Sequence, residues 1–270
     1  MITTRFVDVP ASAHGRAARL AVHVAGHGPL AVLLHGYPQD HRLWLDTLHG
    51  PLTQQRTLAA IDLRGHGDSP STGDLTHPME LFAHDVAAVA RSLADGPVDV
   101  VGLSMGGYVA FALQAMAPAL VRSLVLANTR AVADSPAARE GRDAAITTVL
   151  EQGRRALLAG MLGKLLTPAA APQLRARLFT MAESLPVESI VADLRGLQHR
   201  PDRLPLLPQI TAPTLVVAGE LDAIAPVAEA TAMAAAIPGA RLVVLAGCAH
   251  LTPMEAPERF AAAVGAFWRG

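Results

Sequence analysis

The chain has 270 residues, of which 51% are hydrophobic and 17% are charged, and its 22 basic residues nearly balance 23 acidic ones. This length and composition describe a folded chain with one large core and exclude a disordered polypeptide. The charges are spread without a basic stripe, which argues against nucleic acid and anionic membranes as partners and favours a small molecule.

Short apolar segments near the start of the chain are predicted to be strands. Residues 5–9 and 19–24 form an expected antiparallel hairpin at the edge of a sheet. Residues 30–34 are continuously apolar, which is typical of a strand buried on both faces of a parallel sheet, and residues 57–61 form the next strand. Glycine-rich loops follow these two strands, and the carboxyl ends of strands are where α/β sheets bind ligands.

Helix and strand then alternate regularly. Apolar residues at helical spacing predict a helix over residues 79–93. A strand beginning at residue 98 runs into Ser104, a helix follows from Met105, and residues 123–127 form another strand. This alternation indicates right-handed crossovers in a mostly parallel sheet.

Residues 131–208 carry no convincing strand pattern. The segment is rich in arginine and in helix-forming residues, and glycines and prolines interrupt it. We therefore predict an inserted helical cap over residues 131–208, lying on the carboxyl end of the sheet. The α/β core then consists of residues 1–130 and 209–270.

Sheet order resumes after this insertion. Residues 214–218 and 241–245 are apolar and predict the last two strands. A helix is expected after Pro226, and residues 257–268 form an amphipathic helix at the end of the chain. The predicted fold class is thus α/β, with a mostly parallel eight-stranded sheet flanked by helices.

Ser104 is the candidate nucleophile. It lies in the pattern G-x-S-x-G, with Gly102 two residues before it and Gly106 two residues after it. Glycines at these positions allow the turn between strand and helix to tighten until the serine backbone is strained and its hydroxyl projects. The free N–H groups at the start of the next helix would then lie beside Ser104, where they can stabilise an oxyanion.

Asp222 and His250 are the candidate partners of Ser104, because each lies in a loop after a predicted strand. Serine is a poor nucleophile at neutral pH, so an imidazole must accept its proton and a carboxylate must orient that imidazole. Glu220 is the alternative carboxylate, although it lies nearer its strand. The chain order serine, aspartate, histidine is the order of α/β-hydrolases and differs from that of other serine-hydrolase folds.

Five motifs extend this pattern over almost the whole chain. They are H-G-Y-P at 35–38, D-L-R-G-H-G-D-S at 62–69, G-L-S-M-G-G-Y at 102–108, G-E-L-D-A-I-A-P at 219–226 and A-G-C-A-H-L-T-P-M-E at 246–255. In this combination the sequence resembles the α/β-hydrolases, and within them the small carboxylesterase and enol-lactonase branch. The resemblance implies an α/β-hydrolase fold with an inserted helical cap.

The resemblance also implies the remaining parts of a catalytic site. The backbone N–H groups of Tyr37 and Met105 would form the oxyanion hole. Apart from the resemblance, we expect the Tyr37 ring to line the substrate pocket, with a catalytic role of its hydroxyl as the alternative. The expected enzyme is a carboxylesterase-type serine hydrolase that cleaves esters with short to medium acyl chains through an acyl-enzyme intermediate. No cofactor is implied, and no spacing of His, Asp or Glu in the sequence indicates a zinc site.

Several alternatives stay open at this point. Arg130, which follows strand 123–127, would either bind a substrate carboxylate or anchor the cap. Carboxylate binding would favour a lactone hydrolase similar to 3-oxoadipate enol-lactonase. A non-catalytic ligand-binding protein could use the same scaffold. Carbon–carbon bond hydrolases and perhydrolases share the three candidate residues, whereas Ser104 argues against epoxide hydrolases and haloalkane dehalogenases, which use aspartate.

The expected location follows from cysteine usage and the N-terminal residues. Cys248 is the only cysteine, so no internal disulfide can form and a reducing compartment is expected. Charged residues near the N-terminus interrupt any apolar signal-peptide core. We therefore expect a cytoplasmic monomer or homodimer acting on a small ester or lactone, with His35 and His66 holding loops by hydrogen bonds.

Overall fold

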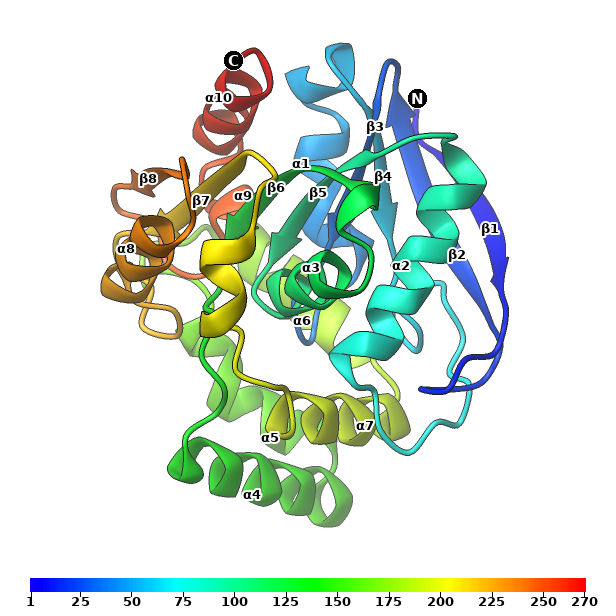
Figure 1. Cartoon of the computed structure of the whole chain (residues 1–270). Helices are drawn as coiled ribbons and strands as arrows, with labels where there is room; N and C mark the ends of the chain where they lie inside the picture. Colours follow the sequence, from blue (N-terminus) through cyan, green and yellow to red (C-terminus); the bar gives the residue numbers. More distant parts are fainter.

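The computed structural model describes all 270 residues and contains one eight-stranded sheet with the order β1-β2-β4-β3-β5-β6-β7-β8 (Figure 1). The strands are β1 Thr3–Val9, β2 Ala18–Gly26, β3 Leu30–Leu34, β4 Thr57–Ile61, β5 Val98–Leu103, β6 Val121–Ala127, β7 Thr214–Gly219 and β8 Arg241–Leu245. The β1–β2 and β2–β4 pairs are antiparallel, and every other pair is parallel. The predicted mostly parallel sheet and its antiparallel edge are confirmed.

Burial along the strands follows their position in the sheet. Every residue of β3 is buried, as its continuous apolar run predicted, and so is every residue of β5 and β7. At the two edges of the sheet β1 is largely exposed and β8 is partly exposed. Four strands are longer than predicted: β1 begins at Thr3, β2 runs from Ala18 to Gly26, β6 begins at Val121 and β7 ends at Gly219. β2 continues to Gly26, because Gly26 still pairs with Thr57 of β4, and β6 begins at Val121, which pairs with Val98.

Helices cover both faces of the sheet. One face carries α2 Met79–Leu93, α3 Met105–Met116 and α8 Val227–Ala236, and the other carries α1 Leu45–Leu48, α9 Thr252–Glu255 and α10 Pro257–Trp268. A hydrophobic core lies between the sheet and the helices on each face. Successive side chains of a strand point to opposite faces, so Val32 of β3 packs in the core on the first face and Leu33 in the core on the second. None of the helices combines the length and the apolar composition needed to cross a membrane.

The segment between β6 and β7 contains helices joined by loops and no strand. It contains α4 Pro136–Gln152, α5 Arg154–Met161, α6 Pro172–Ser184 and α7 Val187–Gln198, and Figure 1 shows α4, α5 and α7 lying together below the sheet. The fully buried carboxylate of Asp193 in α7 attaches this segment to the core through His66 Nε2 at 3.0 Å and His77 Nδ1 at 2.7 Å. Burial opposes the charged form of His66, but the Asp193 carboxylate raises the pKa of this histidine above its usual value.

Candidate active site

Ser104 occupies the turn between β5 and α3 in a conformation that non-glycine residues seldom adopt. Its φ of 53° and ψ of −115° lie outside the usual regions, and such strain costs about 1–3 kcal/mol. The flanking glycines are required by close packing. A Cβ on Gly102 would lie 2.3 Å from the Gly106 carbonyl oxygen, and a Cβ on Gly106 would lie 2.1 Å from that of Leu34. The tight turn leaves the Ser104 side chain half-buried and accessible.

The structure brings Ser104, His250 and Asp222 together from three separate loops. Ser104 Oγ lies 2.9 Å from His250 Nε2, and His250 Nδ1 lies 2.8 Å from Asp222 Oδ2. Asp222 follows β7 and His250 follows β8, and both side chains are buried. Each distance is within hydrogen-bond range, so the arrangement can pass a proton from the serine to an imidazole that the carboxylate orients.

Asp222 is held in its ionised form by several donors. Its Oδ1 accepts hydrogen bonds from the backbone N–H groups of Ile224 at 2.8 Å and Ala225 at 3.0 Å. Burial alone would raise the pKa of Asp222, but the contact with His250 and the hydrogen bonds from the Ala225 N–H and Asn128 lower it below its usual value. Glu220, the alternative carboxylate, instead accepts from the Gly247 N–H at 2.8 Å and does not contact His250.

Asn128 is part of this site, and sequence reasoning missed it. Its Nδ2 donates to Asp222 Oδ2 at 2.9 Å and to the Ala249 carbonyl oxygen at 3.1 Å, while its Oδ1 accepts from Thr252 Oγ1 at 2.6 Å. Asn128 directly follows β6 and has a φ of 48°, a left-handed conformation that asparagine tolerates better than most residues. An asparagine at the carboxyl end of a buried strand was the available signal.

The expected oxyanion hole lies between the loop after β3 and the start of α3. The Tyr37 N–H lies outside any helix or strand, the Met105 N–H is at the first position of α3, and neither donates to an acceptor in the protein. The loop is fixed by His35, which donates from Nδ1 to the Gly36 carbonyl oxygen at 2.8 Å and accepts from the Leu63 N–H at 3.1 Å. Burial lowers the pKa of His35 to about 4, so this histidine is neutral at pH 7.

A cavity of about 430 Å³ separates Tyr37 from the helical segment. Its apolar lining includes Ala145 of α4, Leu157 of α5 and Leu194 of α7, and its basic side chains are Arg142 and Lys164. The hydroxyl of Tyr37 is buried without a partner, and burial raises the pKa of this phenol, so it stays protonated. The volume suits a small ligand, because ligand pockets typically measure about 300–1,000 Å³.

Arg130 does not line this cavity. Its Nη1 lies 3.4 Å from Glu229 Oε1, and it borders a separate, much smaller pocket with Met79 and Arg203. The structure therefore places Arg130 against α8 rather than beside Tyr37. Arg142, which does line the cavity, is better placed than Arg130 to bind a substrate carboxylate. Its Nε donates to Asp134 Oδ2 at 2.9 Å.

Comparisons with known proteins find similar sequences and folds over most of the chain. The sequence model of the family described as "Alpha/beta hydrolase family" matches residues 31–263. A curated relative, the 2-(acetamidomethylene)succinate hydrolase of Mesorhizobium japonicum, is 30% identical over 254 residues, which cover 88% of this chain and 87% of the relative.

Solved structures match nearly the whole chain. An esterase from Thermogutta terrifontis has 34% sequence identity and a TM-score of 0.93, with 98% of each chain covered. The enol-lactonase from Burkholderia xenovorans has 25% identity and a TM-score of 0.85, with 94% of this chain and 97% of that one covered.

Proposed function

Because this chain belongs to the α/β-hydrolase family, we propose that it is a carboxylesterase-type serine hydrolase with Ser104 as nucleophile. The observation that carries the proposal is the unbroken hydrogen-bond chain from Ser104 through His250 to Asp222. The similarity of this protein, over 98% of its length, to the esterase from Thermogutta terrifontis supports ester hydrolysis as the reaction. A non-catalytic binding role is disfavoured, since a binding protein has no need for a strained serine aligned with a histidine.

The first half of the reaction acylates Ser104. His250 Nε2 accepts the hydroxyl proton as Ser104 Oγ attacks the ester carbonyl, and Asp222 stabilises the imidazolium that forms. The negative charge that develops on the carbonyl oxygen accepts hydrogen bonds from the Tyr37 and Met105 N–H groups. Each donor of this kind typically contributes about 2.7–4 kcal/mol to the transition state. His250 then donates its proton to the leaving alcohol.

The second half releases the acid. A water molecule enters the position of the departed alcohol, and His250 accepts its proton as the water oxygen attacks the acyl carbonyl. The same two N–H groups stabilise the second oxyanion. When the bond to Ser104 Oγ breaks, the proton returns from His250 to Ser104 and the free enzyme is restored.

The cavity beside Tyr37 supports a substrate with a short to medium acyl chain. We propose that residues 131–208 act as a cap over the substrate site. The helices α4, α5 and α7 of this segment supply most of the lining of the cavity, and Tyr37 supplies the part that belongs to the core. The apolar members of that lining would contact the acyl chain, and the open side would leave room for the alcohol part of the ester. We further propose a cytoplasmic site of action, since the single cysteine leaves no internal disulfide to form.

Lactone hydrolysis is the second candidate, because the enol-lactonase of Burkholderia xenovorans shares the fold at 25% identity. A lactone acid carries a carboxylate, and Arg142 and Lys164 are the basic side chains of the cavity. Comparing kcat/KM for p-nitrophenyl acetate, butyrate and octanoate with that for an enol-lactone acid tests the assignment. Esterase function predicts that at least one ester exceeds the lactone by tenfold or more, and the reverse order would replace it with lactonase function.

A further inference from the structure

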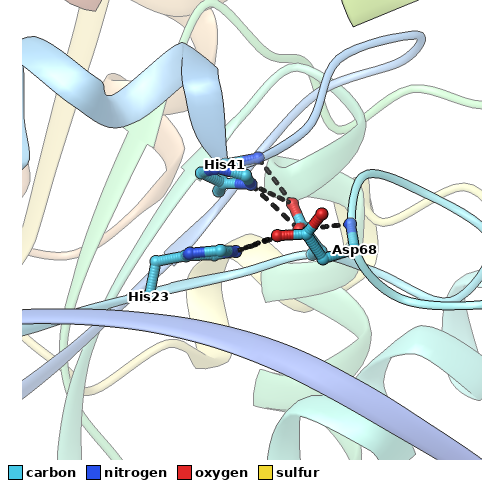
Figure 2. A group of neighbouring side chains, drawn as sticks. His23, His41 and Asp68 are labelled. Carbon is cyan, nitrogen blue, oxygen red and sulfur yellow. Dashed lines mark hydrogen bonds and ion pairs between the residues drawn. The ribbon is translucent and has the colours of Figure 1, made fainter. Parts of the chain in front are cut away.

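A second cluster of polar side chains lies apart from the catalytic residues, at the antiparallel side of the sheet. It consists of His23 in β2, His41 at the start of the 3-10 helix His41–Trp44, and Asp62 and Asp68 in the loop after β4. Figure 2 labels His23, His41 and Asp68. One ligand atom from each residue lies within 4.8 Å of all the others. The spacing along the sequence gave no sign of this cluster, because its members come from three separate segments.

The separations match those around a small cation. The ligands of a tetrahedral Zn²⁺ ion, each about 2.0–2.1 Å from the metal, lie about 3.3 Å from one another. His23 Nε2 lies 3.1 Å from Asp62 Oδ2 and 3.6 Å from Asp68 Oδ2. His41 Nδ1 lies 2.9 Å from the same Asp62 oxygen. Two imidazole nitrogens and two carboxylates are a ligand set that zinc and similar transition metals accept.

The surroundings of the cluster orient its members as the outer contacts of metal sites do. The other ring nitrogen of His23, Nδ1, lies 3.1 Å from the Thr4 hydroxyl, which leaves Nε2 facing the carboxylates. Asp62 is held by backbone N–H groups of His41 at 2.7 Å and Asp68 at 2.9 Å. Partners of this kind fix the tautomer of a ligating histidine and the direction of a ligating carboxylate.

The cluster is buried on one side and open to solvent at Asp68. The side chains of His23 and Asp62 are 5% and 0% exposed, whereas that of Asp68 is 58% exposed. The His23 and His41 rings stack with their centroids 3.4 Å apart and their planes at 19°. Directing both lone pairs at one ion requires the two rings to open from this stack. The His41 side chain is 15% exposed and that of His23 is 5% exposed, so there is more space around His41 for this movement.

We propose that His23, His41, Asp62 and Asp68 bind one divalent transition-metal ion, for which Zn²⁺ is the probe. None of the four hydrogen-bonds to the Ser104–His250–Asp222 group, so the ion is structural. It would join β2 and the loop after β4 to the start of the 3-10 helix His41–Trp44, which directly follows the loop that holds Tyr37. Metal binding would therefore stiffen the segment that presents the expected oxyanion donor.

The test uses untagged full-length protein, stripped with a chelator and titrated with Zn²⁺ by calorimetry. We expect one saturable ion per chain, and a rise in the unfolding temperature of about 5 °C at one hundred times Kd. Asp68→Asn removes an exposed ligand with little risk to the fold and should weaken binding at least about tenfold. His23→Gln should do the same. His27→Gln changes an exposed histidine outside the cluster and should leave binding unchanged.

Cobalt provides a readout of direct coordination. Co²⁺ bound by the wild type should give the strong visible absorption of a four-coordinate ion, and Zn²⁺ should displace it. Absence of saturable binding would overturn the proposal. Binding that His27→Gln weakens but Asp68→Asn and His23→Gln leave unchanged would also overturn it, because the ion would then bind elsewhere on the surface.

Discussion

Asn128 Nδ2 donates a 2.9 Å hydrogen bond to Asp222 Oδ2, the same carboxylate oxygen that faces His250 Nδ1. The two residues come from neighbouring strands, since Asn128 follows β6 and Asp222 follows β7. Asn128 also binds the carbonyl oxygen of Ala249, the residue before the catalytic histidine candidate. One amide therefore positions both the carboxylate and the loop that carries His250.

Removing this amide should lower kcat without changing KM, because Asn128 does not line the cavity. Asn128→Gly deletes the side chain and keeps the left-handed backbone. A hydrogen bond to a charged group contributes about 1.5–3 kcal/mol, so its loss should lower kcat by about 10–100-fold. Asn128→Asp has the same shape but cannot donate, so it should lose at least as much. Near-wild-type kcat in Asn128→Asp, with an unchanged unfolding temperature, would remove the proposed positioning role.

Gly106 should not tolerate a methyl group. An alanine Cβ there would lie 2.1 Å from the Leu34 carbonyl oxygen, a backbone atom that cannot move without shifting β3. We expect Gly106→Ala to lower the free energy of unfolding by about 3 kcal/mol or more. Gly96→Ala is the matched control, because no atom lies within 4 Å of its added Cβ, and it should change stability by less than about 0.5 kcal/mol. Urea unfolding curves compare the two, and equal effects would contradict the packing account.

Ala145 should set the length of acyl chain that the enzyme accepts. It faces the 430 Å³ cavity from α4, so Ala145→Phe would fill part of that volume. We expect kcat/KM for p-nitrophenyl octanoate to fall at least about tenfold while that for the acetate changes little. Ala144→Phe places the same ring on the exposed side of α4 and should leave both values unchanged. If both substrates respond equally to Ala145→Phe, the acyl chain does not occupy this cavity.

Buried His35 should make the fold sensitive to mild acid. Its pKa is lowered to about 4 from the usual value of 6.5, so between these values the unfolded chain binds a proton that the folded chain does not. Stability therefore falls as pH drops from about 6.5 towards 4, by a total of about 3 kcal/mol. His35→Gln cannot take up this proton, so its stability should change less with pH over the same range. Unfolding free energies measured at several pH values decide this, and parallel curves would contradict it.

The sequence predicted the fold well where local pattern decides structure. The bounds of α2 and α10 match the predicted ranges, because apolar spacing and proline define them locally. The extension of β2 to Gly26 depends on pairing with Thr57, a contact that only the assembled sheet provides.

The site residues that directly follow predicted strands could be identified from the sequence. Ser104, Asp222 and His250 each follow a recognisable strand, so the carboxyl edge of the sheet was expected to bring them together. The position of Asn128 after a buried strand could have marked it as a candidate, but its contact with Asp222 and the partner of Arg130 depend on which strands and helices become neighbours.

The assignment of Ser104 as nucleophile is tested most directly by the intact mass of the protein after treatment with a fluorophosphonate. Such a reagent phosphonylates a serine that an adjacent histidine activates. We expect one adduct per chain, located on Ser104, with complete loss of p-nitrophenyl ester turnover. Ser104→Ala should take up no reagent and should lose at least about a thousandfold in kcat. An unmodified wild type, an adduct on another serine, or retained turnover in Ser104→Ala would contradict the assignment.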